Sequence, residues 1–540
     1  MPHFASVTQR RPFAIKAVGK GYAGDCEKLT KSQTAMDSKY LLRICSILLI
    51  LPLSGTRAIA DCNLLDSTVH VRGNIYELTK SAAGQATIES LRKGVAAMMN
   101  RPETDPTSWL SQANIHGVPS DDASPALELW SACQHGSYFF FSWHRMYIYF
   151  FERILRKASG DPDFALPYWN YSDPGQAALP EAFRTPADRS NVLYLPNPDL
   201  RSDDANAGTA MPDDVSSFAQ AFQFANFDSA NGASSPEGVA PSFGGQIVPQ
   251  PVHFGQVHGE LESQPHDNVH VWVGGQGAPG AQFPGWMSDP DTAARDPIFW
   301  IHHANVDRLW KRWLDLGGGR QNPIDDHEWL TQTFTFYDEN GDKCALTGKD
   351  ILDSAQQLSY RYDDDPVGVH AMAPSPPIVP TPALKPLRVF AMAAPATPIS
   401  LEQKKTTVQL RLDPTVSSQM FMSAASTPEK SVMLSVESIN YERPPGVYYQ
   451  VYLNLPQGTQ PDPHGPYYVG NLSLFALKGG TRQFDITKVV GNLKSKGLWK
   501  SDSLAVMLVA QTGNRKVAGE AAPLTIAGKP SFARITLSTR

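Results

Sequence analysis

Several features that mark common classes of protein are scarce or missing in this sequence of 540 residues. It contains only five cysteines, and the three of them beyond residue 60 do not make a disulfide framework. Its net charge is −6, and the sequence contains no run of lysine and arginine residues. We therefore expect no nucleic-acid partner. No internal repeat is visible, which argues against solenoid and propeller folds.

Long apolar runs are also missing, apart from one near the N-terminus. Ile44–Leu53 is apolar, follows two basic residues, and precedes a small-x-small sequence at residues 58–60. This order is typical of a secretory signal peptide, for which Met36 is a plausible start. We therefore expect residues 1–60 to be an N-terminal extension and signal peptide. The mature protein should be exported to the periplasm or secreted, without stable membrane association.

Cleavage after residue 60 leaves three cysteines, which are Cys62, Cys133 and Cys344. Cys62 and Cys344 can pair in an oxidising compartment or remain free thiols, and the sequence leaves both options open. Cys133 lies two residues before a histidine that is itself a candidate metal ligand.

The length of the chain predicts more than one hydrophobic core. Residues 61–365 show the apolar spacing of buried helices, whereas residues 366–395 are rich in proline and alanine and are expected to form a linker. Residues 396–540 contain short alternating strands, among them 432–436 and 504–509. The expected fold is a mainly α domain followed by an all-β sandwich, with the oligomeric state left open.

Six of the 14 histidines fall in three short stretches with helical periodicity, namely His135, His144, His266, His270, His302 and His303. His266 and His270 are four residues apart, so both imidazoles lie on one face of a helix and can bind one ion. Asp267 follows His266, so the glutamate of a zinc-protease H-E-x-x-H motif is missing. Neighbouring helical positions point about 100° apart, so we expect His302 and His303 not to face the same metal.

The stretches themselves are long and specific. Residues 135–145 read His-Gly-Ser-Tyr-Phe-Phe-Phe-Ser-Trp-His-Arg, and residues 296–307 read Asp-Pro-Ile-Phe-Trp-Ile-His-His-Ala-Asn-Val-Asp. They resemble the two copper signatures of the tyrosinase, catechol oxidase and molluscan haemocyanin family, with residues 266–275 completing the second. The resemblance covers residues 62–365 and implies a four-helix bundle that holds a dicopper centre. Residues 396–540 resemble the C-terminal domain of plant-type polyphenol oxidases.

The resemblance implies two copper ions, one bound by each of two histidine triplets. Carried over by position, the ligands of the first ion are His116, His135 and His144, and those of the second are His266, His270 and His303. His302 falls at a non-ligand position. Imidazole suits copper, and three nitrogens per ion leave a face open to dioxygen.

Four further residues receive roles from the same resemblance. Cys133 is either joined to His135 by a thioether bond or a buried free thiol. Glu262 either holds a water that acts as a general base or is a carboxylate stabilised by a helix N-terminus. Asp267 stands where monophenol-active relatives often carry asparagine, and Val271 is a small residue at the substrate entrance.

The implied activity is that of a tyrosinase, with dioxygen and a small phenol as partners. Such an enzyme hydroxylates monophenols at the ortho position and oxidises o-diphenols to o-quinones. The alternatives are a catechol oxidase without monophenolase activity and a haemocyanin-like oxygen carrier. We also expect the C-terminal domain to shield the site, with Phe475 or a neighbour at the entrance, until proteolysis near Lys385 or Arg388.

Overall fold

The computed structural model describes residues 62–539 except for 120–121, 123–126, 196–199, 230–238, 278–280, 282, 366–387, 413–430, 500–503, 514–515, 518–519 and 522–523. The expected signal peptide and most of the expected linker, including Lys385, lie outside these residues. Within them, no helix combines the length and the apolar character needed to cross a membrane.

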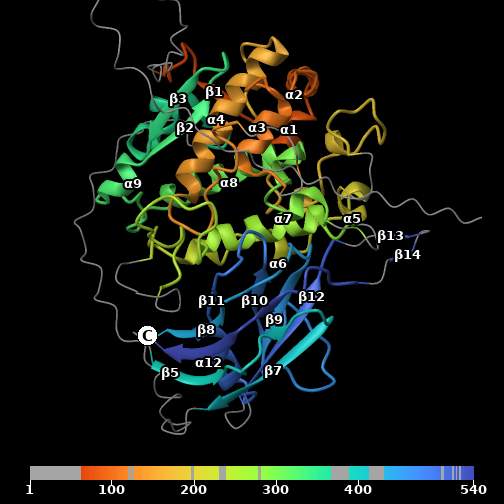
Figure 1. Ribbon diagram of the computed structural model, residues 1–540, viewed down its shortest axis with the longest axis vertical. Helices are drawn as coiled ribbons and strands as arrows, with labels where there is room; N and C mark the ends of the chain where they lie inside the picture. Colours follow the sequence, from red (N-terminus) through yellow and green to blue (C-terminus); the bar gives the residue numbers. More distant parts are fainter. Residues whose placement is uncertain are drawn as a thin grey trace, which may run out of the picture. The chain divides into compact units, whose positions relative to one another are not determined.

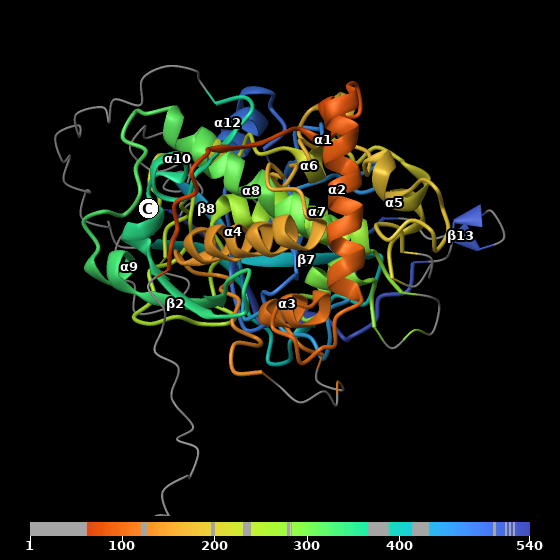
Figure 2. The same ribbon diagram turned by 90° about the horizontal axis from the view of Figure 1, so that it is seen from above.

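The first domain is built from helices, as its periodicity predicts. Its longest helices are α2 (Ala82–Met99), α4 (Phe140–Ser159) and α8 (Ile298–Asp315), and α4 contacts the other two. Figure 2 shows α2 crossing the end of α4. Nearly every side chain of α4 is buried because aromatic residues surround it on all faces. The helix ends at Gly160, whose left-handed backbone (φ 71°) glycine adopts without strain.

The remaining helices of this domain are short and connect the longer ones. A π-helical turn at Glu262–His266 leads directly into α7 (Asp267–Gly274), which completes the predicted four-helix arrangement. The other helices are α1 (Ile75–Leu78), α3 (Trp109–His116), α5 (Asp203–Ala207), α6 (Asp213–Ser216), α9 (His327–Thr331) and α10 (Ser354–Gln357). Single 3-10 turns lie at Pro174–Gln176, Glu181–Phe183, Ala221–Gln223, Trp286–Ser288, Ala293–Arg295 and Gly348–Ile351.

A buried network of charges ties α4 and α8 to the two-stranded parallel sheet of β1 (His70–Arg72) and β4 (Tyr360–Tyr362). Asp307 on α8 accepts hydrogen bonds from Arg145 Nε (2.6 Å) and from Tyr360 Oη (2.7 Å). Arg72 Nε donates to Glu152 on α4 at 2.8 Å. Because each charge has a buried partner of opposite sign, loss of one partner would be costly, about 3–5 kcal/mol.

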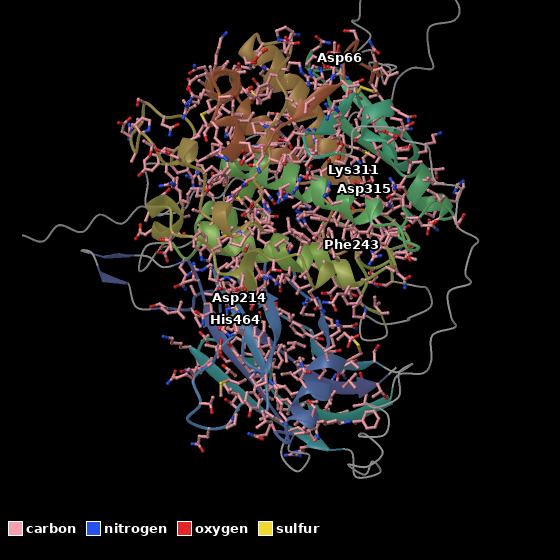
Figure 3. The ribbon with its side chains drawn as sticks, turned by 180° about the vertical axis from the view of Figure 1, so that it is seen from behind. Asp66, Asp214, Phe243, Lys311, Asp315 and His464 are labelled. Carbon is pink, nitrogen blue, oxygen red and sulfur yellow. A yellow bond between two sulfur atoms is a disulfide. The ribbon has the colours of Figure 1, made fainter. Side chains whose placement is uncertain are left out.

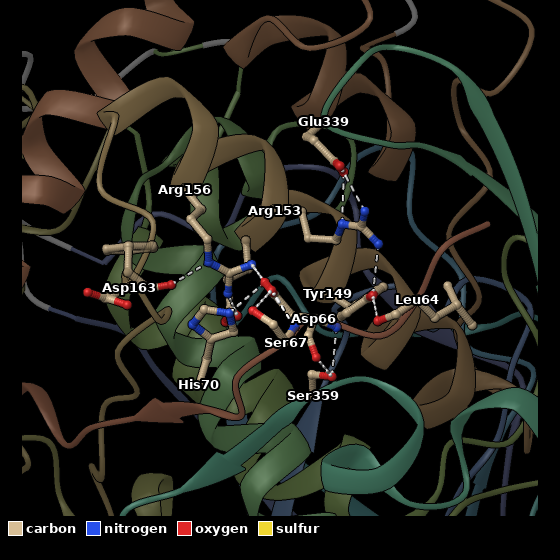
Figure 4. Close-up of polar contacts among 12 residues, drawn as sticks. Leu64, Asp66, Ser67, His70, Tyr149, Arg153, Arg156, Asp163, Glu339 and Ser359 are labelled. Carbon is tan, nitrogen blue, oxygen red and sulfur yellow. Dashed lines mark hydrogen bonds and ion pairs between the residues drawn. The ribbon is translucent and has the colours of Figure 1, made fainter.

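The first residues of the described chain contact the C-terminal half of α4 (Figure 4). Tyr149 Oη donates to Leu64 O (2.6 Å), and Arg153 bonds Glu339 (2.8 Å). Cys62 forms a disulfide with Cys344, so the pairing that the sequence left open is present. Cys344 lies on β3 (Lys343–Thr347), which pairs with β2 (Thr333–Tyr337) as a hairpin.

The second domain contains an eight-stranded sheet with the strand order β10-β9-β12-β7-β5-β16-β8-β11, whose neighbours are all antiparallel. These strands are β5 (Arg388–Ala393), β7 (Lys405–Leu412), β8 (Val432–Glu437), β9 (Tyr448–Leu453), β10 (Tyr468–Ser473), β11 (Arg482–Asp485), β12 (Leu504–Gln511) and β16 (Arg534–Thr539). The shorter strands are β6 (Ile399–Ser400) with β15 (Ser531–Phe532), and β13 (Lys516–Val517) with β14 (Glu520–Ala521). One helix, α12 (Thr487–Ser495), adds to the β structure that the sequence predicts.

The expected linker at 366–395 is too long at its C-terminal end. Strand β5 begins at Arg388 and pairs with both β16 and β7, so Arg388 does not lie in an extended linker. Phe390 is buried in the core of the sheet. The alanines of this strand resemble the composition of the linker, which is why the strand was not recognised from the sequence.

The sheet meets the helical domain along β10, which contacts α6 and α7 (Figure 1). Asp214 on α6 accepts a hydrogen bond from Gln450 Nε2 (2.8 Å), and its carbonyl accepts one from Asn471 Nδ2 (2.8 Å). Figure 3 labels Asp214 close to His464. Arg482 also forms a buried bidentate ion pair with Glu260 at 2.8 and 3.0 Å. Polar contacts therefore fix how the sheet lies on the helices.

Candidate metal centre

The first predicted triplet comes from three separate elements. His116 is the last residue of α3, His135 lies in the loop before α4, and His144 lies on α4. The ring centroids are 5.1 Å apart for His116 and His135, 5.2 Å for His135 and His144, and 5.6 Å for His116 and His144. The fold therefore brings these three rings together.

Backbone carbonyls orient two of these rings. The Nδ1–H group of His116 donates to Pro290 O at 2.7 Å, and that of His144 donates to Phe140 O at 2.8 Å. A carbonyl can only accept, so the proton is on Nδ1 and the lone pair of each ring is on Nε2. Among the described residues no carbonyl is bonded to Nδ1 of His135, which lies 3.2 Å from Cys133 Sγ.

The second predicted triplet comes from two neighbouring helical segments. His266 and His270 flank the first turn of α7, with ring centroids 4.5 Å apart, and His303 on α8 lies 5.0 Å from His266. His270 Nδ1 donates to Met287 O at 2.9 Å, whereas His266 Nδ1 bonds the carboxylate of Asp267 at 2.8 Å. The two triplets adjoin, because the rings of His144 and His303 stack with centroids 4.4 Å apart.

The inner nitrogens of these rings have no partner among the described residues. This is true of the buried Nε2 atoms of His116, His135, His144, His266, His270 and His303. Burial also lowers the pKa of these imidazoles, that of His144 to about 3, so the rings are neutral near pH 7. Buried neutral imidazoles with free lone pairs are suitable ligands for a transition metal such as copper.

His302 differs from the prediction. The potential ligand atoms of His266, His270, His302 and His303 all lie within 4.8 Å of one another. Two neighbouring histidines of α8 therefore do face the same site, because an imidazole reaches far enough from its Cβ to offset a 100° difference in direction. His303 also belongs to a second such group, with His116 and His144, whereas His302 does not.

Glu262, Asp267 and a histidine that the sequence did not single out, His258, form a buried cluster beside the centre. Both oxygens of Glu262 accept the N–H of Gly136, at 2.9 and 3.2 Å. His258 Nδ1 lies 2.9 Å from Asp267 Oδ2 and 3.7 Å from Glu262 Oε1. Burial raises the pKa of both carboxyl groups, and His258 counteracts this increase.

Cys133 is buried, forms no disulfide and lies beside two histidines. Its Sγ is 3.2 Å from Nδ1 of His135 and 3.2 Å from Nδ1 of His253, which the sequence reasoning also missed. Burial raises the pKa of the thiol. The sulfur is thus placed against the ring to which the thioether was expected.

Residues of the second domain cover the centre. The ring of Phe475 stacks on His270 with centroids 4.1 Å apart and lies 5.7 Å from His266 and 5.8 Å from His135. Val271, expected at the substrate entrance, is 2 % exposed. In this arrangement the rings that could bind metal are separated from solvent.

Comparisons with known protein families agree with this centre. Residues 106–316 match the common central domain of tyrosinase, and residues 323–374 match the polyphenol oxidase middle domain. Residues 389–526 match a domain of unknown function. The first match contains all of the histidines discussed above.

Curated relatives extend the match. The latent chloroplastic polyphenol oxidase of Prunus armeniaca is 35% identical over 53% of this chain, and the chain spans about half of it (48%). A tyrosinase of Hahella sp. (strain CCB-MM4) is 28% identical over 82% of this chain and 95% of its own length. The names of the relatives include polyphenol oxidase, tyrosinase and catechol oxidase.

Among solved structures, latent apple tyrosinase matches with a TM-score of 0.57 and 24% identity, over 89% of this chain and 99% of the other. At that identity the match concerns the fold. The helical centre is a metal-binding site, and the domain matches specify its class. The chain contains the common central domain of tyrosinase and the middle domain of polyphenol oxidases, which are copper-dependent oxidases with a pair of copper ions as cofactor.

Proposed function

We propose that the protein is a tyrosinase. It hydroxylates monophenols at the ortho position and oxidises o-diphenols to o-quinones, and dioxygen is reduced to water. The observation that supports this most is the convergence of six buried imidazoles, whose Nε2 atoms have no partner in the described part of the chain.

In this proposal His116, His135 and His144 hold one copper ion, and His266, His270 and His303 hold the other. A bound copper pair would supply redox chemistry towards dioxygen and the phenol. The ligands are neutral, so they leave the positive charge of both ions uncompensated and favour binding of a phenolate. His302 is assigned no ligand role, because the resemblance places it at a non-ligand position, although its ring lies in the same group as those of His266, His270 and His303.

The remaining residues orient groups and move protons. Glu262, held by the N–H of Gly136, takes the phenolic proton through a water molecule. Burial raises the pKa of Glu262 towards the range in which a carboxylate can both accept and release a proton near neutral pH. Cys133 lies beside the ring of His135, and a thioether between them would fix that ring.

A catechol oxidase without monophenolase activity is the second candidate, and Asp267 favours it. Its Oδ1 bonds His266 at 2.8 Å and its Oδ2 bonds His258 at 2.9 Å. A carboxylate whose two oxygens are already engaged is a weaker partner for the water that would take the phenolic proton. The hydroxylation step is more sensitive to this loss than the oxidation of a catechol.

The covering domain makes the intact chain latent in this proposal. Phe475 stacks on His270, at the place where a phenol would approach the second ion. Cleavage before β5, in the segment that contains Lys385, would allow the sheet to leave. The Cys62–Cys344 disulfide supports an oxidising compartment and hence export.

Oxygen uptake by the copper-loaded chain tests the proposal, with tyrosine and with a catechol as substrates, before and after limited proteolysis. A tyrosinase consumes oxygen with both substrates after the cut, whereas a catechol oxidase does so only with the catechol. Equal rates before and after a cut that mass spectrometry places between residues 365 and 388 would contradict latency. No uptake with either substrate after this cut would favour the oxygen carrier instead.

A further inference from the structure

His258 is a buried histidine outside both predicted triplets. It lies in the segment that precedes the π-helical turn and is 5% exposed. Its Nδ1 faces Asp267 Oδ2 at 2.9 Å and Glu262 Oε1 at 3.7 Å, and its Nε2 faces Ala476 O at 3.4 Å. Every group within reach of its two nitrogens is therefore an acceptor.

His258 contacts two carboxylates, and each of them bonds a group in or next to a different histidine triplet. The second oxygen of Asp267 bonds the Nδ1 of His266 at 2.8 Å. Glu262 accepts the N–H of Gly136, which follows His135 in the chain. One imidazole thus contacts both acidic groups next to the two histidine triplets.

Two basic side chains serve the three carboxyl groups in this place. Glu260, Glu262 and Asp267 are all buried, and Arg482 pairs with Glu260. His258 is the group that contacts the other two carboxylates, and it offers two N–H donors when protonated. Burial lowers the pKa of His258, but the neighbouring Glu262 and Asp267 raise it to about 9. This direction agrees with a ring that carries a proton on both nitrogens.

We propose that His258 is a positioning residue of the metal centre. It holds one oxygen of Asp267 so that the other oxygen fixes the ring of His266. The inference rests on the proposed function, in which His266 is a copper ligand. It also explains how the site carries an acidic residue next to a ligand without an unpaired buried charge.

A double-mutant cycle on copper retention tests this role. The copper-loaded chain is titrated with a chelator, and the copper that remains per chain is measured for His258→Phe, Asp267→Asn and the double variant. His258→Phe should release one of the two ions at a chelator concentration about 10-fold lower than the unmodified protein. The same change in the Asp267→Asn background should have less than about a 2-fold effect, because the group through which His258 acts is already altered.

Two further variants separate positioning from general destabilisation. His258→Gln keeps one donor without the charge and should fall between the unmodified chain and His258→Phe. If His258→Phe does not fold, copper retention is compared for His258→Gln instead. His327→Gln changes an exposed histidine and should release copper like the unmodified chain. The melting temperature of each metal-free variant is measured in parallel.

Each outcome has one interpretation. Copper retention by a folded His258 variant that equals that of the unmodified chain would overturn the proposal. Losses that add in the double variant would show that His258 does not act through Asp267, and would overturn it as well. If the unmodified chain itself does not hold two copper ions, the proposed function fails, independently of His258.

Discussion

The two halves of the centre are built in different ways. The rings of His116 and His144 are fixed by backbone carbonyls on separate elements, whereas the ring of His266 is fixed by the side chain of Asp267. The backbone of α4 supplies the carbonyl of Phe140, and the loop that contains Pro290 supplies the other. In the second half one ring, His270, is fixed by a backbone carbonyl, but His266 depends on the carboxylate of Asp267 and, through it, on His258. The first half should therefore tolerate substitutions around it better than the second.

The covering domain also distinguishes the halves. Phe475 stacks on His270 at 4.1 Å, while its distance to the nearest ring of the first half, His135, is 5.8 Å. Ala476 O contacts His258, and Ser473 Oγ lies 3.5 Å from Asp267 O. The segment that covers the site thus acts mainly on the half that depends on side chains.

The largest effect is expected at His303, which belongs to a group of rings in each half. His303→Ala should lower the rate of catechol oxidation by about 10³-fold or more, because the second ion would lose a ligand whose ring also adjoins the first triplet. His302→Ala is the matched variant and should cost about 10-fold or less. Copper content and oxygen uptake check both variants, and the opposite order would exchange the roles of the two histidines.

Acid should weaken the metal-free protein through both halves. The pKa of His144 and that of His302 are lowered to about 3 by burial, so the folded state binds fewer protons than the unfolded state below pH 6.5. Stability is complete above that pH and is lost as the pH falls towards 3. At pH 5 the loss is about 2 kcal/mol for each group.

Urea unfolding of the metal-free protein at pH 7 and pH 5 measures this loss. His144→Phe and His302→Phe each remove one of the groups, one from each half, and should each reduce the loss by about the same amount. A loss that only one variant reduces would show that acid acts on one half alone. Stability that is independent of pH would contradict the burial of neutral imidazoles.

Removal of the covering ring should raise activity. If the covered site is open a few per cent of the time, Phe475→Ala should raise the apparent activity of the intact chain by about 10- to 30-fold. Phe283→Ala, at a phenylalanine that is 37% exposed, is the control and should leave latency unchanged. Steady-state oxygen uptake by the uncut chains is the measurement, and equal rates for all three chains would exclude Phe475 as the cover.

The smallest effect is expected at Cys133, in the half fixed mainly by the backbone. Cys133→Ala should lower the affinity for one copper ion by about 10-fold or less, because only the ring of His135 loses a partner. A thioether would also make the intact copper-loaded chain lighter by two hydrogen atoms, which mass spectrometry detects. An unchanged mass would assign Cys133 as a free thiol beside the ring.

Sequence periodicity predicts much of this fold because burial imposes it. The apolar pattern that runs from the residues after 137 to 157 predicts α4, and the spacing of His266 and His270 predicts two rings on one helical face. Strands such as β8 and β12 follow from their alternation or apolar character. Strand β5 was missed because small alanines give no such signal.

The residues that support the ligands were harder to find. His258 and His253 lie in a segment without periodicity, and their contacts depend on how that segment folds over the helices. One signal was available, since His258 precedes Glu262 by four residues and the two side chains do meet. The direction of His302 depends on its side-chain rotamer, which spacing along a helix does not determine.

The most direct test of the two-half centre is an anomalous difference map, recorded at the copper absorption edge from crystals of the copper-loaded protein. Two peaks are expected, one among the Nε2 atoms of His116, His135 and His144 and the other among those of His266, His270 and His303. A single peak within the group of His266, His270, His302 and His303, with none beside His116 and His144, would contradict a binuclear centre in this chain.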